Sequence, residues 1–73
     1  MNTYNITDDI YFEMIRRAER YENTCWDCIE LEDGCAVTFA IRDSRPYNVE
    51  VLDEDNNEFE HDFSMARYEA LAS

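Results

Sequence analysis

Gly34 is the only glycine of the chain, and it follows Asp33 between two apolar-rich runs. An Asp-Gly pair in this setting is typical of the two-residue loop of a β-hairpin, because a type I′ turn needs positive φ at both central residues. With this loop, three pairs of residues lie opposite each other on the face that we expect to form the core: Trp26 with Ile41, Cys28 with Phe39, and Glu30 with Val37. The glycine therefore sets the predicted register of the first two strands.

Two further strands are predicted after this hairpin. A turn over residues 43–46 leads into a third strand, residues 47–51, in which apolar and polar side chains alternate. A second hairpin follows through residues 54–56, where Asn56 can take the left-handed position of a three-residue loop. The returning strand then sets three pairs of residues face to face: Val51 with Phe59, Val49 with His61, and Tyr47 with Phe63.

A helix is predicted over residues 7–21, where apolar side chains recur at helical spacing. Thr7 is a suitable N-cap, and Asp8 and Asp9 in the first turn complement the positive end of the helix dipole. The apolar face that we expect to pack on the sheet consists of Tyr11, Met14, Ile15, Ala18 and Tyr21.

A shorter helix is expected at the end of the chain, with Ser64 as its N-cap. Its apolar side is formed by Met65, Tyr68, Leu71 and Ala72. We therefore predict a single domain over residues 1–73 of the α+β class. It is a three- to four-stranded antiparallel β-meander with an N-terminal helix and a short C-terminal helix, in the order α-β-β-β-β-α.

The charge of the chain limits its partners. The sequence has 18 Asp and Glu against six Arg and no Lys, which gives a formal net charge of −12. Without Lys, and with one glycine, it has neither a Schiff-base lysine nor a Walker-type phosphate loop. This much negative charge repels phosphates, which argues against direct binding to nucleic acid or to an anionic membrane and favours a basic protein partner.

The compartment is predicted from the N-terminus and the cysteines. The first residues lack the basic and apolar regions of a secretory signal, and no apolar run approaches the length of a membrane span. Three cysteines cannot all pair within the chain, so we expect reduced thiols. The prediction is a cytoplasmic protein.

Two segments offer metal-binding side chains but depart from the required spacing. The three cysteines and His61 are ligands of a type that zinc binds, yet Cys25 and Cys28, three residues apart in a strand, point to opposite faces. Residues 53–58 begin like a calcium loop, but the sixth position is Glu58 in place of glycine. We expect no metal and no cofactor, and keep a zinc-stabilised domain as an alternative.

Catalysis has little support in the sequence. His61 is the only histidine and could act as a general base beside Glu60 or Asp62. The predicted register instead places it on the inward face, opposite Val49, and no serine or cysteine is identifiable as its nucleophile. We expect a protein that is not an enzyme.

The acidic residues are unevenly distributed. Residues 22–73 hold 14 Asp and Glu against three Arg, a net −11 of the total −12. In the predicted register Glu50 faces Glu60, and like charges directly opposite each other destabilise a sheet. A charged patch that costs stability suggests a function, because carboxylates on a rigid sheet can imitate the phosphates of a nucleic acid. The residues that we expect to bind the partner are Glu50, Asp53, Glu54, Asp55, Glu58, Glu60 and Asp62.

The leading hypothesis is a non-enzymatic protein-binding module whose acidic β-sheet face docks on a basic partner surface, such as that of a nucleic-acid-binding protein. An inhibitor from a phage or mobile element that imitates nucleic acid would act in this way. The alternative from another class is a small homo-oligomeric structural or accessory subunit, for example a homodimer, that associates through apolar surface such as Ile29, Leu31 and Phe12. The simplest interpretation is a solvated face that keeps a small protein soluble.

Overall fold

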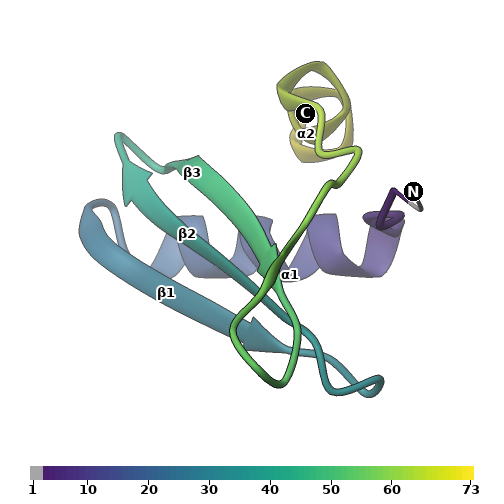
Figure 1. Cartoon of the computed structure of the whole chain (residues 1–73). Helices are drawn as coiled ribbons and strands as arrows, with labels where there is room; N and C mark the ends of the chain where they lie inside the picture. Colours follow the sequence, from purple (N-terminus) through teal and green to yellow (C-terminus); the bar gives the residue numbers. More distant parts are fainter. Residues whose placement is uncertain (1–2) are drawn as a thin grey trace.

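The computed structural model describes residues 3–73 and contains one four-stranded antiparallel sheet and two helices (Figure 1). The elements are, in chain order, α1 (Asp8–Arg20), β1 (Thr24–Glu30), β2 (Ala36–Arg42), β3 (Arg45–Leu52), β4 (Glu58–Phe59) and α2 (Met65–Ala72). The strands lie in the order β1-β2-β3-β4, and Figure 1 shows α1 running behind the sheet. The predicted α+β class and element order are therefore confirmed. Neither helix of the described chain has the length and apolar character needed to cross a lipid bilayer.

The helix boundaries are close to those predicted. Thr7 is the N-cap of α1, although its side chain makes no capping hydrogen bond. The helix ends at Arg20, and Tyr21, predicted on its apolar face, is the C-cap and is exposed. Ser64 caps α2 as expected, since its hydroxyl accepts a hydrogen bond from the Arg67 amide at 3.3 Å.

The loop between β1 and β2 has three residues, which corrects the register predicted from the Asp-Gly pair. The Leu31 amide donates to the Cys35 carbonyl at 2.9 Å, so residues 32–34 form the loop. Within that loop positive φ occurs only at Gly34, at +86°. A type I turn followed by a left-handed residue is the usual form of a three-residue hairpin loop, and it needs only one glycine.

This shift of one residue moves the side chains of β1 to the other face of the sheet. The observed cross-strand pairs include Asp27 with Phe39, Cys28 with Thr38, and Ile29 with Val37. The predicted pairs were therefore wrong, and the three residues of β1 that we expected in the core point away from it: Trp26, Cys28 and Glu30.

The turn between β2 and β3 is a two-residue type I′ turn, the type that we predicted for the β1–β2 hairpin. Asp43 and Ser44 have φ values of 52° and 61°, as a type I′ turn requires. Residues 45–46, which were predicted in the turn, therefore begin β3. In the last hairpin Asn56 has a φ of 63° and closes the predicted three-residue loop.

The strand β4 is shorter than predicted. Val51 pairs with Phe59 as expected, but the ladder ends there. The chain then runs beside the N-terminal segment, where the Tyr4 amide donates to the Glu60 carbonyl at 2.7 Å and the Asp62 amide donates to the Tyr4 carbonyl at 3.1 Å. Within residues 3–73 the strand ladder therefore lacks three predicted pairs: Val49 with His61, Tyr47 with Phe63, and Glu50 with Glu60.

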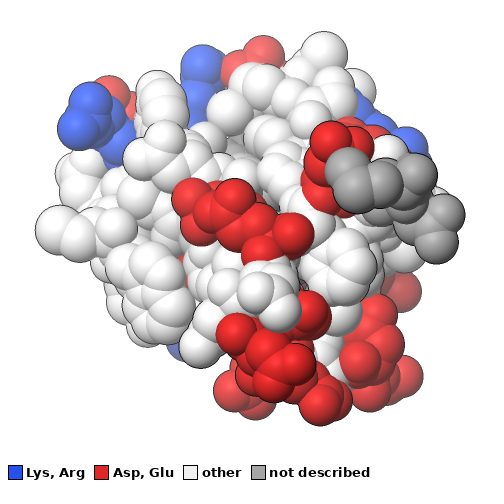
Figure 2. Space-filling view, viewed as in Figure 1, with Lys and Arg blue, Asp and Glu red and all other residues white. Residues whose placement is uncertain are grey.

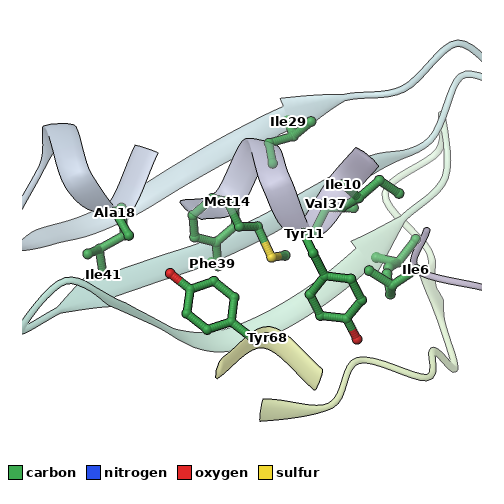
Figure 3. Packing of buried hydrophobic residues seen from close by; sticks show 11 residues of the cluster. Ile6, Ile10, Tyr11, Met14, Ala18, Ile29, Val37, Phe39, Ile41 and Tyr68 are labelled. Carbon is green, nitrogen blue, oxygen red and sulfur yellow. The ribbon is translucent and has the colours of Figure 1, made fainter. Parts of the chain in front are cut away.

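The core lies between α1 and one face of the sheet. Figure 3 shows Tyr11, Met14 and Ala18 of α1 directed at the strand residues, with Tyr68 of α2 beside them. The strands contribute Ile29, Val37, Phe39, Ile41 and Val51, all buried. Burial of each large apolar side chain contributes about 1.5–3 kcal/mol, so this contact holds the helix on the sheet.

The apolar surface proposed for self-association is mostly internal. Ile29 is only 7% exposed, and Leu31 packs against the core. Phe12, on α1, is the exposed member of the three at 41%. The alternative of an apolar oligomer interface therefore loses two of the residues on which it was based.

Candidate functional site

The two turns that lie at the same end of the sheet carry most of the predicted binding residues. In a meander of four strands, the β1–β2 turn and the β3–β4 turn share one end. Residues 30–35 and 52–58 hold seven acidic residues and no arginine. We refer to these seven as the acidic hairpin end: Glu30, Glu32, Asp33, Asp53, Glu54, Asp55 and Glu58. Figure 2 shows a group of acidic side chains, in red, at the bottom of the view, where the two hairpin loops lie in Figure 1.

The two turns touch each other. A Cβ atom placed on Gly34 would overlap the carboxylate of Glu54. The pKa of the Cys35 thiol is raised by burial, by a hydrogen bond with Asp33, and by the charges of Asp33, Asp53 and Glu54. Carboxylates from both turns therefore act on one thiol, which shows that their fields overlap.

Six of the seven predicted binding residues are exposed: Glu50, Glu54, Asp55, Glu58, Glu60 and Asp62. Three of them belong to the acidic hairpin end. Glu50 lies further along β3, where it pairs with Thr38. Glu60 follows β4 beside the N-terminal segment.

Two of the predicted residues, Asp53 and Asp62, also hold the backbone with their carboxylates. Asp53 Oδ1 accepts from the amides of Asp55 at 2.8 Å and Asn57 at 2.9 Å. These amide hydrogen bonds, that of Asn57 first, lower the pKa of the Asp53 carboxyl. Asp62 Oδ1 accepts from the Ile6 amide at 2.7 Å. Both carboxylates are therefore held in place, Asp53 by its own loop and Asp62 by the N-terminal segment.

Three acidic residues of the β1–β2 hairpin were missed by the sequence prediction: Glu30, Glu32 and Asp33. The rule that alternate turns of a meander share one end could have placed them beside residues 53–58. Asp33 accepts from the Cys35 amide at 3.0 Å and from the Tyr4 hydroxyl at 2.9 Å, and these bonds lower the pKa of its carboxyl. Burial and the bond to Asp33 raise the pKa of Tyr4 to about 12.

The arginines lie away from this end and are in contact with other parts of the protein. Four form ion pairs: Arg16 with Glu13, Arg17 with Asp27, Arg45 with Glu69, and Arg67 with Asp8. Arg20 and Arg42 lie over the rings of Tyr21 and Tyr47, at 6.0 and 5.8 Å from the ring centroids. None of these contacts involves the acidic hairpin end, so its carboxylates have no arginine partner among residues 3–73.

Both ring nitrogens of His61 form hydrogen bonds with the backbone. Its Nδ1 accepts from the Phe63 amide at 3.2 Å, so Nε2 carries the hydrogen that it donates to the Val49 carbonyl at 2.9 Å. Its side chain thus replaces the missing strand pairing with β3. In this arrangement the His61 ring joins the segment after β4 to β3.

Metal ligands do not converge in the described part of the chain. Residues 3–73 contain no group of three or more His, Cys, Asp or Glu side chains placed to hold a metal ion. The thiols of Cys25, Cys28 and Cys35 are free. The zinc alternative therefore gains no support from the geometry.

The acidic hairpin end is thus a highly charged end of the sheet. Its carboxylates suit ion pairing and hydrogen bonding with a basic surface. A comparison with known proteins finds no matching family model, no similar curated protein and no similar solved structure.

Proposed function

We propose that this chain is a non-enzymatic binding protein whose acidic hairpin end docks on a basic surface of a partner protein. The observation that carries the proposal is the convergence of seven acidic residues from two turns with no arginine among them. Two tight loops hold the backbone of this end in place, so its carboxylates are presented with little loss of conformational entropy on binding.

The partner that fits such a surface is one that binds nucleic acid, because its basic cleft already accepts closely spaced negative charges. The protein would then act as an inhibitor that imitates nucleic acid. We propose the cytoplasm as its compartment, which the three free thiols support.

A matched pair of variants tests the proposal. The first, the end variant, changes four exposed residues of the acidic hairpin end: Glu32→Gln, Glu54→Gln, Asp55→Asn and Glu58→Gln. The second, the control variant, changes four exposed acidic residues elsewhere: Asp9→Asn, Glu19→Gln, Glu22→Gln and Asp43→Asn. Both variants have the same net charge, so only the position of the acidic residues differs.

The measurement is affinity capture at low and at high salt, followed by mass spectrometry and by titration of the purified partner. We expect the end variant to lose at least tenfold in affinity and the control variant to lose much less, because charge at the contact dominates charge elsewhere. Double-stranded DNA added to the complex should displace the protein. A partner that binds both variants equally well, or whose complex is unaffected by DNA, would contradict docking in a nucleic-acid cleft.

A further inference from the structure

Among residues 3–73, Trp26 is the most exposed of the large apolar side chains, at 64%. It lies in a β-bulge: Thr24 pairs with Ile41 and Asp27 pairs with Phe39, so two residues of β1 oppose Ala40 alone. Cross-strand neighbours share a face, and the bulge therefore turns Trp26 to the side of the sheet opposite α1. Its ring has no aromatic or arginine partner among residues 3–73.

This side of the sheet is uncovered by either helix. We refer to it as the open sheet face, defined by Trp26, Cys28, Glu30, Ala40, Tyr47 and Glu50. Glu30 and Glu50 lie on it toward the acidic hairpin end, while the aromatic residues lie toward the opposite end. A groove of about 670 Å³ runs beside the bulge and is lined by Cys25, Ala40 and Tyr47 among others.

The face already accommodates one guanidinium group. The side chain of Arg42 lies over the Tyr47 ring, 5.8 Å from its centroid. Guanidinium groups stack on aromatic faces because they are planar and weakly hydrated. Trp, whose ring attracts cations more strongly than that of Tyr, is the aromatic residue of this face that is still free.

The edge of β1 is blocked at Cys28, so we expect a partner to approach the sheet by its open face. Arg17 Nη1 donates to the Cys28 carbonyl at 2.8 Å, and the Cys28 amide donates to Asp27 Oδ1 at 2.8 Å. These are the outward backbone groups of the strand at that point, so a partner strand cannot pair with them. Proteins protect exposed edges with charged residues and bulges in this way.

We propose that the open sheet face recognises arginine in the basic partner, with one guanidinium stacked on Trp26 and neighbouring basic groups paired with Glu30 and Glu50. This inference rests on the proposed function, since it adds arginine selectivity to the same docking event. Four residues of extended strand separate Trp26 from Glu30, a span of roughly 13 Å. An extended arginine-rich segment with basic side chains on one face matches that span.

The test uses two defined probes, an octa-arginine and an octa-lysine peptide, titrated into the protein at 0.15 M salt. Trp26 is the only tryptophan, so its fluorescence reports contact at this position directly. We expect the arginine peptide to change the Trp26 emission and to bind about three- to tenfold more tightly than the lysine peptide, the range that one cation–π contact supports.

Variants separate stacking from charge. Trp26→Leu should remove the preference for arginine while affinity for the lysine peptide is retained, and Trp26→Phe should keep part of the preference. Phe12→Leu, an exposed aromatic on α1, is the matched control and should behave as the unchanged protein. Calorimetric titration gives these affinities, since the Trp26 variants lack the fluorescent probe.

The outcomes distinguish the two proposals. An arginine preference that survives in Trp26→Leu, or equal affinities for the two peptides in the unchanged protein, would overturn arginine recognition by this face. The proposed function has a separate test in the end variant. If the end variant binds both peptides as tightly as the unchanged protein does, the acidic hairpin end is not the docking site and the proposed function is wrong.

Discussion

The acidic hairpin end and the surface that carries the arginines differ in how their charges are balanced. Each arginine has an acidic or aromatic partner within the protein, and the acidic partners are Asp8, Glu13, Asp27 and Glu69. The acidic hairpin end has seven carboxylates and no arginine contact among the described residues. Charge on the arginine-bearing surface is balanced by ion pairs, whereas at the acidic hairpin end the carboxylates repel one another and, within residues 3–73, only Asp33 and Asp53 are compensated, by hydrogen bonds to the backbone.

This difference suggests what each region is selected for. A protein that needed only solubility could distribute its acidic residues evenly, which would reduce their mutual repulsion. Here the repulsion is concentrated where two tight turns meet. An external cation, such as an arginine of a partner, would relieve it.

The largest expected effect concerns Arg17, which joins α1 to the edge of β1. Arg17→Ala removes the only donor of the Cys28 carbonyl among the described residues and the charged donor of the partly buried Asp27 carboxylate, which keeps the Cys28 amide alone, and we expect the free energy of unfolding to fall by about 1–3 kcal/mol. Arg16→Ala, one residue away, removes only an exposed pair with Glu13 and should stay within about 0.5 kcal/mol. Urea denaturation measures both. Equal effects would show that the balanced charges of this surface do not hold the fold.

The next effect concerns the loop that brings the two turns together. Gly34→Ala places a side chain at a φ of +86° and against the Glu54 carboxylate, so we expect a loss of about 1–3 kcal/mol in the free energy of unfolding. Asn56 occupies the equivalent position of the other loop, and Asn56→Gly should be neutral or slightly stabilising. The same denaturation experiment compares them. A neutral Gly34→Ala variant would mean that the loop does not need its left-handed residue.

A smaller effect separates the two regions by salt. The end variant should be more stable than the unchanged protein at 10 mM salt, by up to about 1 kcal/mol, because like charges across neighbouring segments are removed. The gain should shrink at 0.5 M salt, where the unchanged protein is screened. The control variant, whose four acidic residues lie outside the acidic hairpin end, should gain less. Thermal melts at both salt concentrations measure this, and equal gains in the two variants would remove the distinction between the two regions.

The order of the elements could be predicted from local signals. The apolar spacing of α1, the caps at Thr7 and Ser64, and the loop ending in Asn56 each act within a few residues, so the sequence determines them nearly independently of the rest of the chain. The register of β1 could not be predicted in the same way. The register depends on whether Asp33 takes a positive φ. Because Asp33-Gly34 fits both a two-residue and a three-residue loop, the local sequence does not decide between them.

The site was predicted in part for the same reason. The acidic residues of the last hairpin were identified because they are adjacent in sequence. Glu32 and Asp33 join them only through the topology of the sheet, and Glu30 and Trp26 reach the open face only in the corrected register. The role of Asp62 was also out of reach, because its partner Ile6 lies at the other end of the chain.

The smallest expected effect is a change of stability with pH at the Tyr4–Asp33 hydrogen bond, which ties the N-terminal segment to the acidic hairpin end. The pKa of Tyr4 is raised to about 12 in the folded protein, against about 10 in an unfolded chain. Between these two values the unfolded chain loses the phenol proton while the folded chain keeps it. The stability contributed by Tyr4 is therefore fully present below pH 10 and is lost as the pH rises toward 12.

Tyr4→Phe isolates this contribution, and Tyr47→Phe, far from Asp33, serves as its control. We expect Tyr4→Phe to be slightly less stable than the control at pH 8 and the difference to close as the pH approaches 12, measured by urea denaturation across that range. The carboxyl of Asp33, whose pKa is lowered in the fold, contributes stability above its unfolded pKa that is lost as the pH falls through its folded value. Tyr4→Phe should therefore also lose part of the acid-side dependence. A difference that stays constant from pH 8 to 12 would show that the bond to Tyr4 does not couple the N-terminal segment to the charge of the acidic hairpin end.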